Sequence, residues 1–234
     1  VVTLPELATA LQADLLSDTL AGIQSVLQPL GARLIGGHSL EARDSQTSPA
    51  NPAGLSLVLS VNGRSPAGRH WGKGPLRNGD GLLLCRPIGT GVLFAAAMAG
   101  AAQPQWIDAA LAQMQQCQAS LVELLSRRGC RACTDVTGFG LLGHLGEMLA
   151  ASPENCNVTL AAAAIPALPG ALPLLSAGWT SSLAPSNASA LALLEERVQL
   201  QGQTDAAHHA LLIDPQTCGP LLAALPAAAA QGAL

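Results

Sequence analysis

The chain has 234 residues, of which 49% are hydrophobic, and its formal net charge at pH 7 is −4. A chain of this length and apolarity can bury a substantial core, so it should form one large or two small globular domains. Its eleven Lys and Arg residues are scattered along the sequence. This leaves no basic stripe for a phosphate backbone and argues against a nucleic-acid partner.

Aromatic residues are rare, with two Phe, three Trp and no Tyr. The core must then be built from Leu, Val, Ile and Ala, which favours closely packed helices in an α+β or α/β fold. The most apolar long stretch, 160–175, contains three prolines. It is also shorter than the ~20 residues of a membrane span. We interpret it as a buried, kinked connection and expect no membrane partner.

Six cysteines are spread irregularly along the chain, which favours a reducing, cytoplasmic location over a disulfide scaffold. Cys130 and Cys133 form a lone CxxC motif, but no second motif completes a metal cage, and core cysteines are the favoured interpretation. The first residues, VVTLPELATALQ, lack both an initiator Met and the layout of a signal peptide. They predict a piece of a longer protein.

In chain order, apolar residues at three-to-four spacing predict a helix over 6–31, with Gly31 as its stop. A short strand at 32–35 should follow, and the polar stretch 41–54 is predicted to be a loop. Alternation over 55–61 predicts a second strand. The Gly-rich connection that follows it is the best candidate for a boundary, and we place the domains at 1–64 and 65–234.

In the second domain, a buried strand is predicted at 82–85 and a helix of small residues at 89–100. One amphipathic helix should cover 105–127, with a core stripe formed by Ile107, Leu111, Met114, Cys117, Leu121, Leu124 and Leu125. A strand at CTDV (133–136) should lead into a helix at 138–152. The late segment LLIDPQTCGPLL (211–222) predicts a strand, a turn and a helix.

The segment TDVTGFG (134–140) carries the densest signal for chemistry. Asp135 stands at a predicted strand end and is followed by Thr137 and two glycines that lead into a helix. Carboxylate oxygens bind Mg²⁺ and helix N-termini favour phosphates, so Asp135 is a candidate magnesium ligand beside a phosphate. The alternative, that Asp135 or Thr137 merely caps the helix, stays open.

Two further segments resemble ligand-binding turns. In GGHS (36–39), paired glycines after a strand let backbone N–H groups approach an anion or a nucleotide, although a simple turn explains them too. In DPQTCG (214–219), a phosphate-facing turn competes with a helix start that has Asp214 as N-cap and Pro215 at the first helical position.

The histidines give weaker signals. His144 and Glu147 lie one helical turn apart and could pair, although solvent-facing or tertiary hydrogen bonds are the favoured interpretation. His208 and His209 are adjacent and point in different directions, which argues against a shared metal and places them on the surface. No Ser-His-Asp order, HExxH motif, Walker loop or convincing GxGxxG supports a common hydrolase or dehydrogenase.

Four segments occur together in one order: LIGGHSLE, LLLCRPIGTGVL, CTDVTGFGLLGHLGEML and IDPQTCGPLL. They resemble selenophosphate synthetase, also called selenide, water dikinase, from the superfamily that includes aminoimidazole ribonucleotide synthetase. The resemblance runs from about residue 5 to about residue 225. It implies an α+β fold in which 65–234 form the synthetase C-terminal domain, a mixed sheet covered by helices. Residues 1–64 would be the C-terminal part of the ATP-binding and dimerisation domain.

The resemblance implies an enzyme, a homodimer in this family, that makes selenophosphate, AMP and phosphate from ATP, selenide and water with Mg²⁺. It makes Asp135 a magnesium ligand and places Gly37, His38 and Ser39 around the nucleotide across a dimer interface. The family's reactive Cys or selenocysteine, its catalytic Lys and its other Asp residues belong to its N-terminal half. A single carboxylate cannot neutralise a triphosphate with its metals, so we expect this chain by itself to be inactive, with no catalytic residue of its own.

The sequence also departs from the family pattern. Cys218 replaces a family Ser, Pro220 replaces a family Gly, and 178–188 has lost its Gly- and Thr-rich character. An alternative function is therefore a paralogue without catalysis, a dimerisation or regulatory module fused to an enzyme such as a flavin-dependent oxidoreductase. A weaker alternative, a thiamine-phosphate or purine-pathway ATP enzyme, is disfavoured by Phe139 and by the LLGHL that follows.

Overall fold

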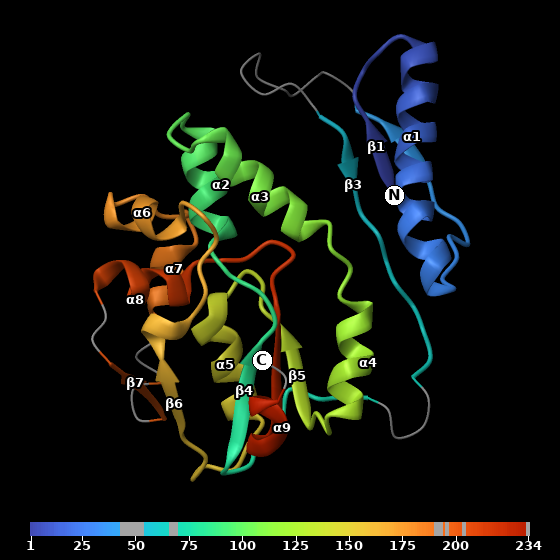
Figure 1. Ribbon diagram of the computed structural model, residues 1–234. Helices are drawn as coiled ribbons and strands as arrows, with labels where there is room; N and C mark the ends of the chain where they lie inside the picture. Colours follow the sequence, from blue (N-terminus) through green and yellow to red (C-terminus); the bar gives the residue numbers. More distant parts are fainter. Residues whose placement is uncertain (43–53, 66–69, 190–193, 195–196, 203–204, 233–234) are drawn as a thin grey trace. The chain divides into compact units, whose positions relative to one another are not determined.

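The computed structural model describes residues 1–42, 54–65, 70–189, 194, 197–202 and 205–232 (Figure 1). The chain forms two compact units, which we call unit 1 (Val1–Gly68) and unit 2 (Arg69–Leu234). Both contain helices and small sheets, so the α+β prediction is confirmed. Most of the predicted loop at 41–54 lies outside the described residues.

Unit 1 is a three-stranded sheet with one long helix. The middle strand β1 (Val2–Leu4) pairs in parallel with β2 (Ser39–Glu41) and antiparallel with β3 (Ser56–Leu57). Helix α1 (Thr9–Leu27) continues into the 3₁₀ turn η1 (Gln28–Leu30), and Gly31 follows in the left-handed conformation with φ 67°. The predicted helix and its stop are therefore confirmed.

Both strand predictions in unit 1 need correction. Residues 32–35 form no strand, because the residues that pair with β1 begin at Ser39, opposite Val2. The strand predicted at 55–61 shortens to two residues for the same reason, since β1 supplies only Val2 and Thr3 as partners. Apolar alternation favours a strand, but only a partner's backbone completes its ladder.

The sheet of unit 2 is antiparallel, with strand order β4-β8-β5. Strand β8 (Leu221–Pro226) lies between β4 (Asp80–Leu84) and β5 (Ala132–Asp135). Its side chains alternate between a large core, which contains Leu222 and Ala224, and a small core built on Leu125, Ala223 and Leu225. Burial on both faces explains why this strand is an unbroken apolar run.

Helices cover this sheet on its large-core face and border the small core. In chain order they are α2 (Thr90–Met98), α3 (Pro104–Met114), α4 (Ala119–Arg127), α5 (Gly140–Ala150), α6 (Ala171–Ser176), α7 (Ala184–Ser189), α8 (Ala206–Ile213) and α9 (Ala227–Gln231). A separate parallel pair, β6 (Val158–Ala161) and β7 (Val198–Gln201), and the 3₁₀ turn η2 (Ala162–Ala164) complete unit 2. Within the described residues, no helix is long and apolar enough to cross a membrane.

The predicted strands near 82–85 and 133–136 and the helices near 89–100 and 138–152 are confirmed. The single helix predicted over 105–127 is wrong, because α3 ends at Met114 and α4 begins at Ala119. At the break, the side chain of Gln118 donates to the Gly219 carbonyl (3.1 Å) and accepts from the Leu221 N–H (3.2 Å). These bonds to the start of β8 satisfy polar backbone groups that a continuous helix would not reach.

The order predicted for 211–222 is reversed. Helix α8 ends at Ile213 and β8 begins at Leu221. Asp214 is therefore the C-cap of α8, and the proposed N-cap role with Pro215 is wrong. Short apolar runs do not separate helix from strand by periodicity alone. Here the pairing of β8 with both β4 and β5 makes residues 221–226 a strand and not a helix.

Candidate functional site

The TDVTGFG segment forms a loop between β5 and α5 that is held from two sides. Val136 is fully buried, and its N–H donates to the Pro220 carbonyl over 2.9 Å. The Thr137 carbonyl accepts from the N–H groups of Gly140 (3.0 Å) and Gln216 (2.9 Å). Phe139, the N-cap residue of α5, makes no capping hydrogen bond with its side chain. The N-cap of α5 is therefore neither Asp135 nor Thr137, so the capping interpretation of these two side chains is wrong, and the Gly140 N–H, the first of α5, is already bonded to the Thr137 carbonyl.

Asp135, the predicted magnesium ligand, is exposed at the end of β5. In the part of the chain that the structure describes, no group of three or more His, Cys, Asp or Glu side chains is placed to hold a metal ion. The residues present therefore fit one oxygen ligand of a hard cation, and the remaining ligands would have to come from water, a phosphate or another polypeptide segment.

A hydrogen-bonded network runs from this loop through α5. Thr137 Oγ1 lies 3.1 Å from His144 Nε2, and His144 Nδ1 lies 2.9 Å from Glu147 Oε2. Lys73 Nζ donates to the same Glu147 oxygen over 2.6 Å. His144 thus pairs with Glu147 and also hydrogen-bonds Thr137. The sequence-based preference for a tertiary hydrogen bond instead of the pair with Glu147 is therefore corrected, because both form. Sequence patterns missed Lys73, because 74 positions separate it from Glu147.

The DPQT turn does not face a phosphate. Gln216 Oε1 accepts from the N–H groups of Gly89 (2.8 Å) and Thr90 (3.2 Å), and Asp214 Oδ2 accepts from Gly91 (3.0 Å). The turn therefore caps the N-terminus of α2, and both side chains are buried. Burial raises the pKa of Asp214 to about 7. Among the described residues, its Oδ1 finds no hydrogen-bond partner.

The remaining candidates have structural roles. Cys130 and Cys133 are free, half-buried thiols beside the small core, as the core interpretation predicted. The hydrogen bond with Cys130 and then burial raise the pKa of Cys133. His209 is exposed and His208 half-buried. His208 pairs with Asp205, which accepts from its backbone N–H over 2.9 Å at the start of α8.

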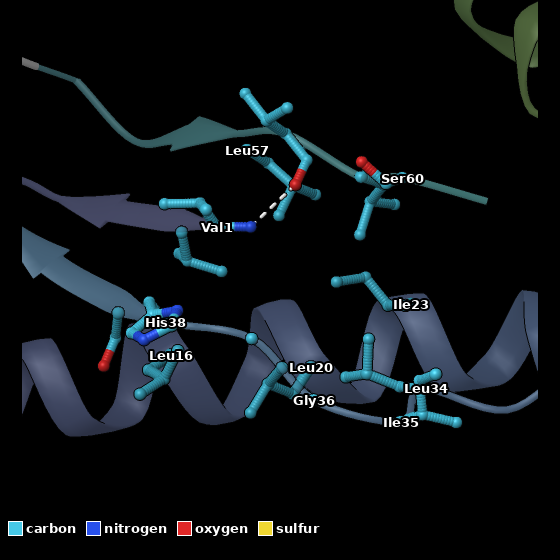
Figure 2. A pocket seen from close by; sticks show the side chains of 15 residues that line it. Val1, Leu16, Leu20, Ile23, Leu34, Ile35, Gly36, His38, Leu57 and Ser60 are labelled. Carbon is cyan, nitrogen blue, oxygen red and sulfur yellow. Dashed lines mark hydrogen bonds between the residues drawn. The ribbon is translucent and has the colours of Figure 1, made fainter. Parts of the chain in front are cut away.

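Gly37, His38 and Ser39 line a cavity of about 670 Å³ in unit 1 (Figure 2). Leu16, Leu20 and Ile23 of α1 line one side, and the segment from Leu57 to Ser60 lines the opposite side. The lining is mainly aliphatic, so nucleotide contacts here would come from the backbone of 37–39. The His38 carbonyl is already bonded to the Val2 N–H (2.9 Å). Asp135 belongs to unit 2.

Gly37 is not required by the packing of this unit. No atom lies within 4 Å of where its Cβ would stand, and its φ is outside the left-handed region. We expect Gly37→Ala to change the free energy of unfolding by less than about 0.5 kcal/mol. If backbone N–H groups here approach a nucleotide, the same variant should raise the Kd for ATP of the full-length protein about tenfold, because the methyl group blocks that approach.

Calorimetric titration with Mg-ATP measures this Kd, and urea unfolding measures the stability. Gly22→Ala is the matched control, since its Cβ also meets no atom within 4 Å and it lies on α1, outside the cavity lining. An unchanged Kd in Gly37→Ala would contradict the nucleotide assignment of 37–39.

In unit 2, strand β5 of a three-stranded antiparallel sheet leads through a glycine-rich loop into helix α5. This arrangement makes the chain an α+β protein with its candidate site in that loop. Residues 77–234 match the model of the AIR synthase related protein family, C-terminal domain, and the chain belongs to this family. It is similar to selenide, water dikinases, which confirms the resemblance drawn from its motifs. It is 33% identical over 223 residues to that of Desulfitobacterium hafniense, with 94% of this chain and 59% of the relative covered.

A second relative, the selenide, water dikinase of Geobacter metallireducens, is 34% identical over 220 residues, with coverage of 93% and 59%. The chain thus spans about three fifths of the length of these relatives. Among solved structures, E. coli HypE, a hydrogenase maturation protein, matches with a TM-score of 0.58 at 18% identity, covering 99% of this chain and 58% of that one. Thiamine-monophosphate kinase from Stenotrophomonas maltophilia matches at 0.57 and 16%, with coverage of 99% and 62%. These likenesses show the fold alone.

Proposed function

We propose that this chain is the C-terminal part of a selenide, water dikinase, a phosphotransferase that makes selenophosphate, AMP and phosphate from ATP, selenide and water. The observation that carries the proposal is the exposed carboxylate of Asp135 at the start of the glycine-containing loop that leads into α5. An oxygen ligand for a cation and the positive end of the α5 helix dipole then stand at one loop, which suits a metal-bound phosphate. The similarity to selenide, water dikinases supports the same assignment.

In this proposal Asp135 binds Mg²⁺, and the dipole of α5 favours a phosphate oxygen at the loop that precedes this helix. When bound, the Mg²⁺ ion would neutralise negative charge on the phosphate. The backbone of Gly37, His38 and Ser39 holds the nucleotide of a second copy, which requires a homodimer. We also propose that the protein acts in the cytoplasm.

Asp135→Asn in the full-length protein should lower the rate of AMP formation by about 100-fold, since the amide keeps the size of the side chain but removes its charge. Chromatographic measurement of AMP from ATP and selenide checks this. The matched control is Asp108→Asn, an exposed aspartate on α3, which should keep the wild-type rate. Equal rates for both variants would contradict the metal role of Asp135.

The chain by itself should not bind Mg-ATP tightly, because one carboxylate leaves most of the charge of the triphosphate unpaired. Titration calorimetry with this chain should give no saturable heat at micromolar Mg-ATP. Tight, magnesium-dependent binding would show that the nucleotide site is complete within the 234 residues.

Cys218 favours a second candidate, the module without catalysis. It stands where the family has Ser, is exposed, and has a φ of 49° in a turn next to β8. A full-length protein that dimerises but forms no AMP from ATP and selenide would support this candidate and overturn the dikinase.

A further inference from the structure

The Thr137–His144–Glu147–Lys73 network fixes the direction of each hydrogen bond in it. The hydrogen bond from Lys73 lowers the pKa of Glu147, so Glu147 is a carboxylate at neutral pH and can only accept. His144 Nδ1, 2.9 Å away, must therefore carry a hydrogen. In the neutral imidazole the other nitrogen, Nε2, is then bare and accepts.

The bare Nε2 decides what the Thr137 hydroxyl can do. Because Nε2 accepts over 3.1 Å, the hydroxyl proton of Thr137 points toward His144. The oxygen keeps two lone pairs and has no second proton, so any ligand of Thr137 must be a hydrogen-bond donor or a cation. A fully ionised phosphate oxygen accepts only and does not fit this position.

The His144 imidazole is held firmly enough to fix the direction of its hydrogen bond with Thr137. His144 is 5% exposed, so water does not compete for its nitrogens. The ring of Phe139 lies with its centroid 5.6 Å from that of the imidazole. Thr137 itself is only half-buried and stands two residues after Asp135, in the loop that leads to α5. Its outward lone pairs are therefore within reach of a small ligand at this loop.

We propose that Thr137 binds the water substrate of the dikinase reaction as a hydrogen-bond acceptor, and that His144 and Glu147 are positioning residues that keep it an acceptor. This inference rests on the proposed function. A water molecule donates a hydrogen bond to Thr137 and keeps its lone pairs for the phosphorus atom that it attacks, so the network orients the water without contacting the nucleotide. The attack forms the new P–O bond of the phosphate product while the bond from that phosphorus to the oxygen that leaves with AMP breaks, and the proton of the water is released to solvent.

The hydrogen-bond direction can be tested on this chain alone. Long-range ¹⁵N–¹H correlation spectra at pH 8 should show His144 with a protonated Nδ1 and a bare Nε2, and Thr137→Ser should keep this pattern. A doubly protonated ring, or a hydrogen on Nε2, would overturn the proposal, because Thr137 would then be free to donate to a phosphate.

The function of the network is tested in the full-length protein. Thr137→Val removes the hydroxyl while keeping the branched shape, and it should lower the rate of AMP and phosphate formation by about 100-fold. The KM for ATP should change by less than about twofold, since the hydroxyl binds water and not the nucleotide. Thr137→Ser should restore the rate to within about fivefold of wild type, and the melting temperature of each variant reports its folding.

Each other outcome is decisive. A wild-type rate in Thr137→Val, or a loss that appears only in the KM for ATP, would overturn the water assignment while the dikinase function stands. A folded wild-type protein that forms no AMP would overturn the proposed function together with it. A Thr137→Ser variant as slow as Thr137→Val would assign the loss to packing of the methyl group and overturn the role of the hydroxyl.

Discussion

Gly140→Ala should lower the free energy of unfolding of unit 2 by more than about 3 kcal/mol. Gly140 opens α5 with a φ of 69°, which disfavours any residue with a Cβ. An added Cβ would also stand 2.8 Å from the Ile213 carbonyl carbon and 2.9 Å from its oxygen. Both are backbone atoms at the end of α8, so neither can rotate away.

Gly138→Ala is the matched control in the same loop, because no atom lies within 4 Å of its Cβ position. We expect a change below about 1 kcal/mol there. Urea unfolding followed by circular dichroism measures both variants. Equal free energies of unfolding for Gly140→Ala and Gly138→Ala would contradict the close approach of Gly140 to Ile213 at the end of α8.

The stability of unit 2 should fall as the pH rises from about 4 to about 7, because of Asp214. Burial raises the pKa of Asp214 to about 7 from its usual 3.8. Between these values the unfolded chain has lost the proton and the folded chain keeps it, so each rise in pH favours unfolding. A difference of roughly three pKa units corresponds to about 4 kcal/mol over the whole window, with no further change from this group above pH 7. Glu147, whose pKa Lys73 lowers, acts in the opposite direction and only below about pH 4.5.

Asp214→Asn should flatten this pH dependence, since the amide does not titrate and its oxygen can still accept from the Gly91 N–H. The exposed Asp108→Asn variant on α3 should keep the wild-type slope. Unfolding free energies at pH 4, 5, 6, 7 and 8 measure the three curves. A wild-type stability that rises from pH 4 to pH 7 would contradict the proton on buried Asp214.

Local patterns predicted the elements that spacing and turn residues mark out, including strands β4 and β5, which find their partner in the distant β8. Helix α1, strand β5, which ends at Asp135, and helix α5, which begins at Gly140, were all found from spacing and turn residues. The predictions that failed depend on distant partners. Residues 32–35 had the composition of a strand but no strand to pair with, and Gln118 interrupts a helix through bonds to β8, which lies a hundred positions away.

The features of the candidate site also differ in whether neighbouring or distant residues form them. The sequence by itself determined the family of this chain and singled out Asp135, because a carboxylate, its glycines and the following helix are consecutive residues. Only the tertiary structure decided that the DPQT turn caps α2 rather than binding a phosphate, and that His144 links Thr137 to Glu147 and Lys73. The physical reason is that a hydrogen bond depends on distance in space. Packing of unit 2 sets that distance for residues 74 or 127 positions apart.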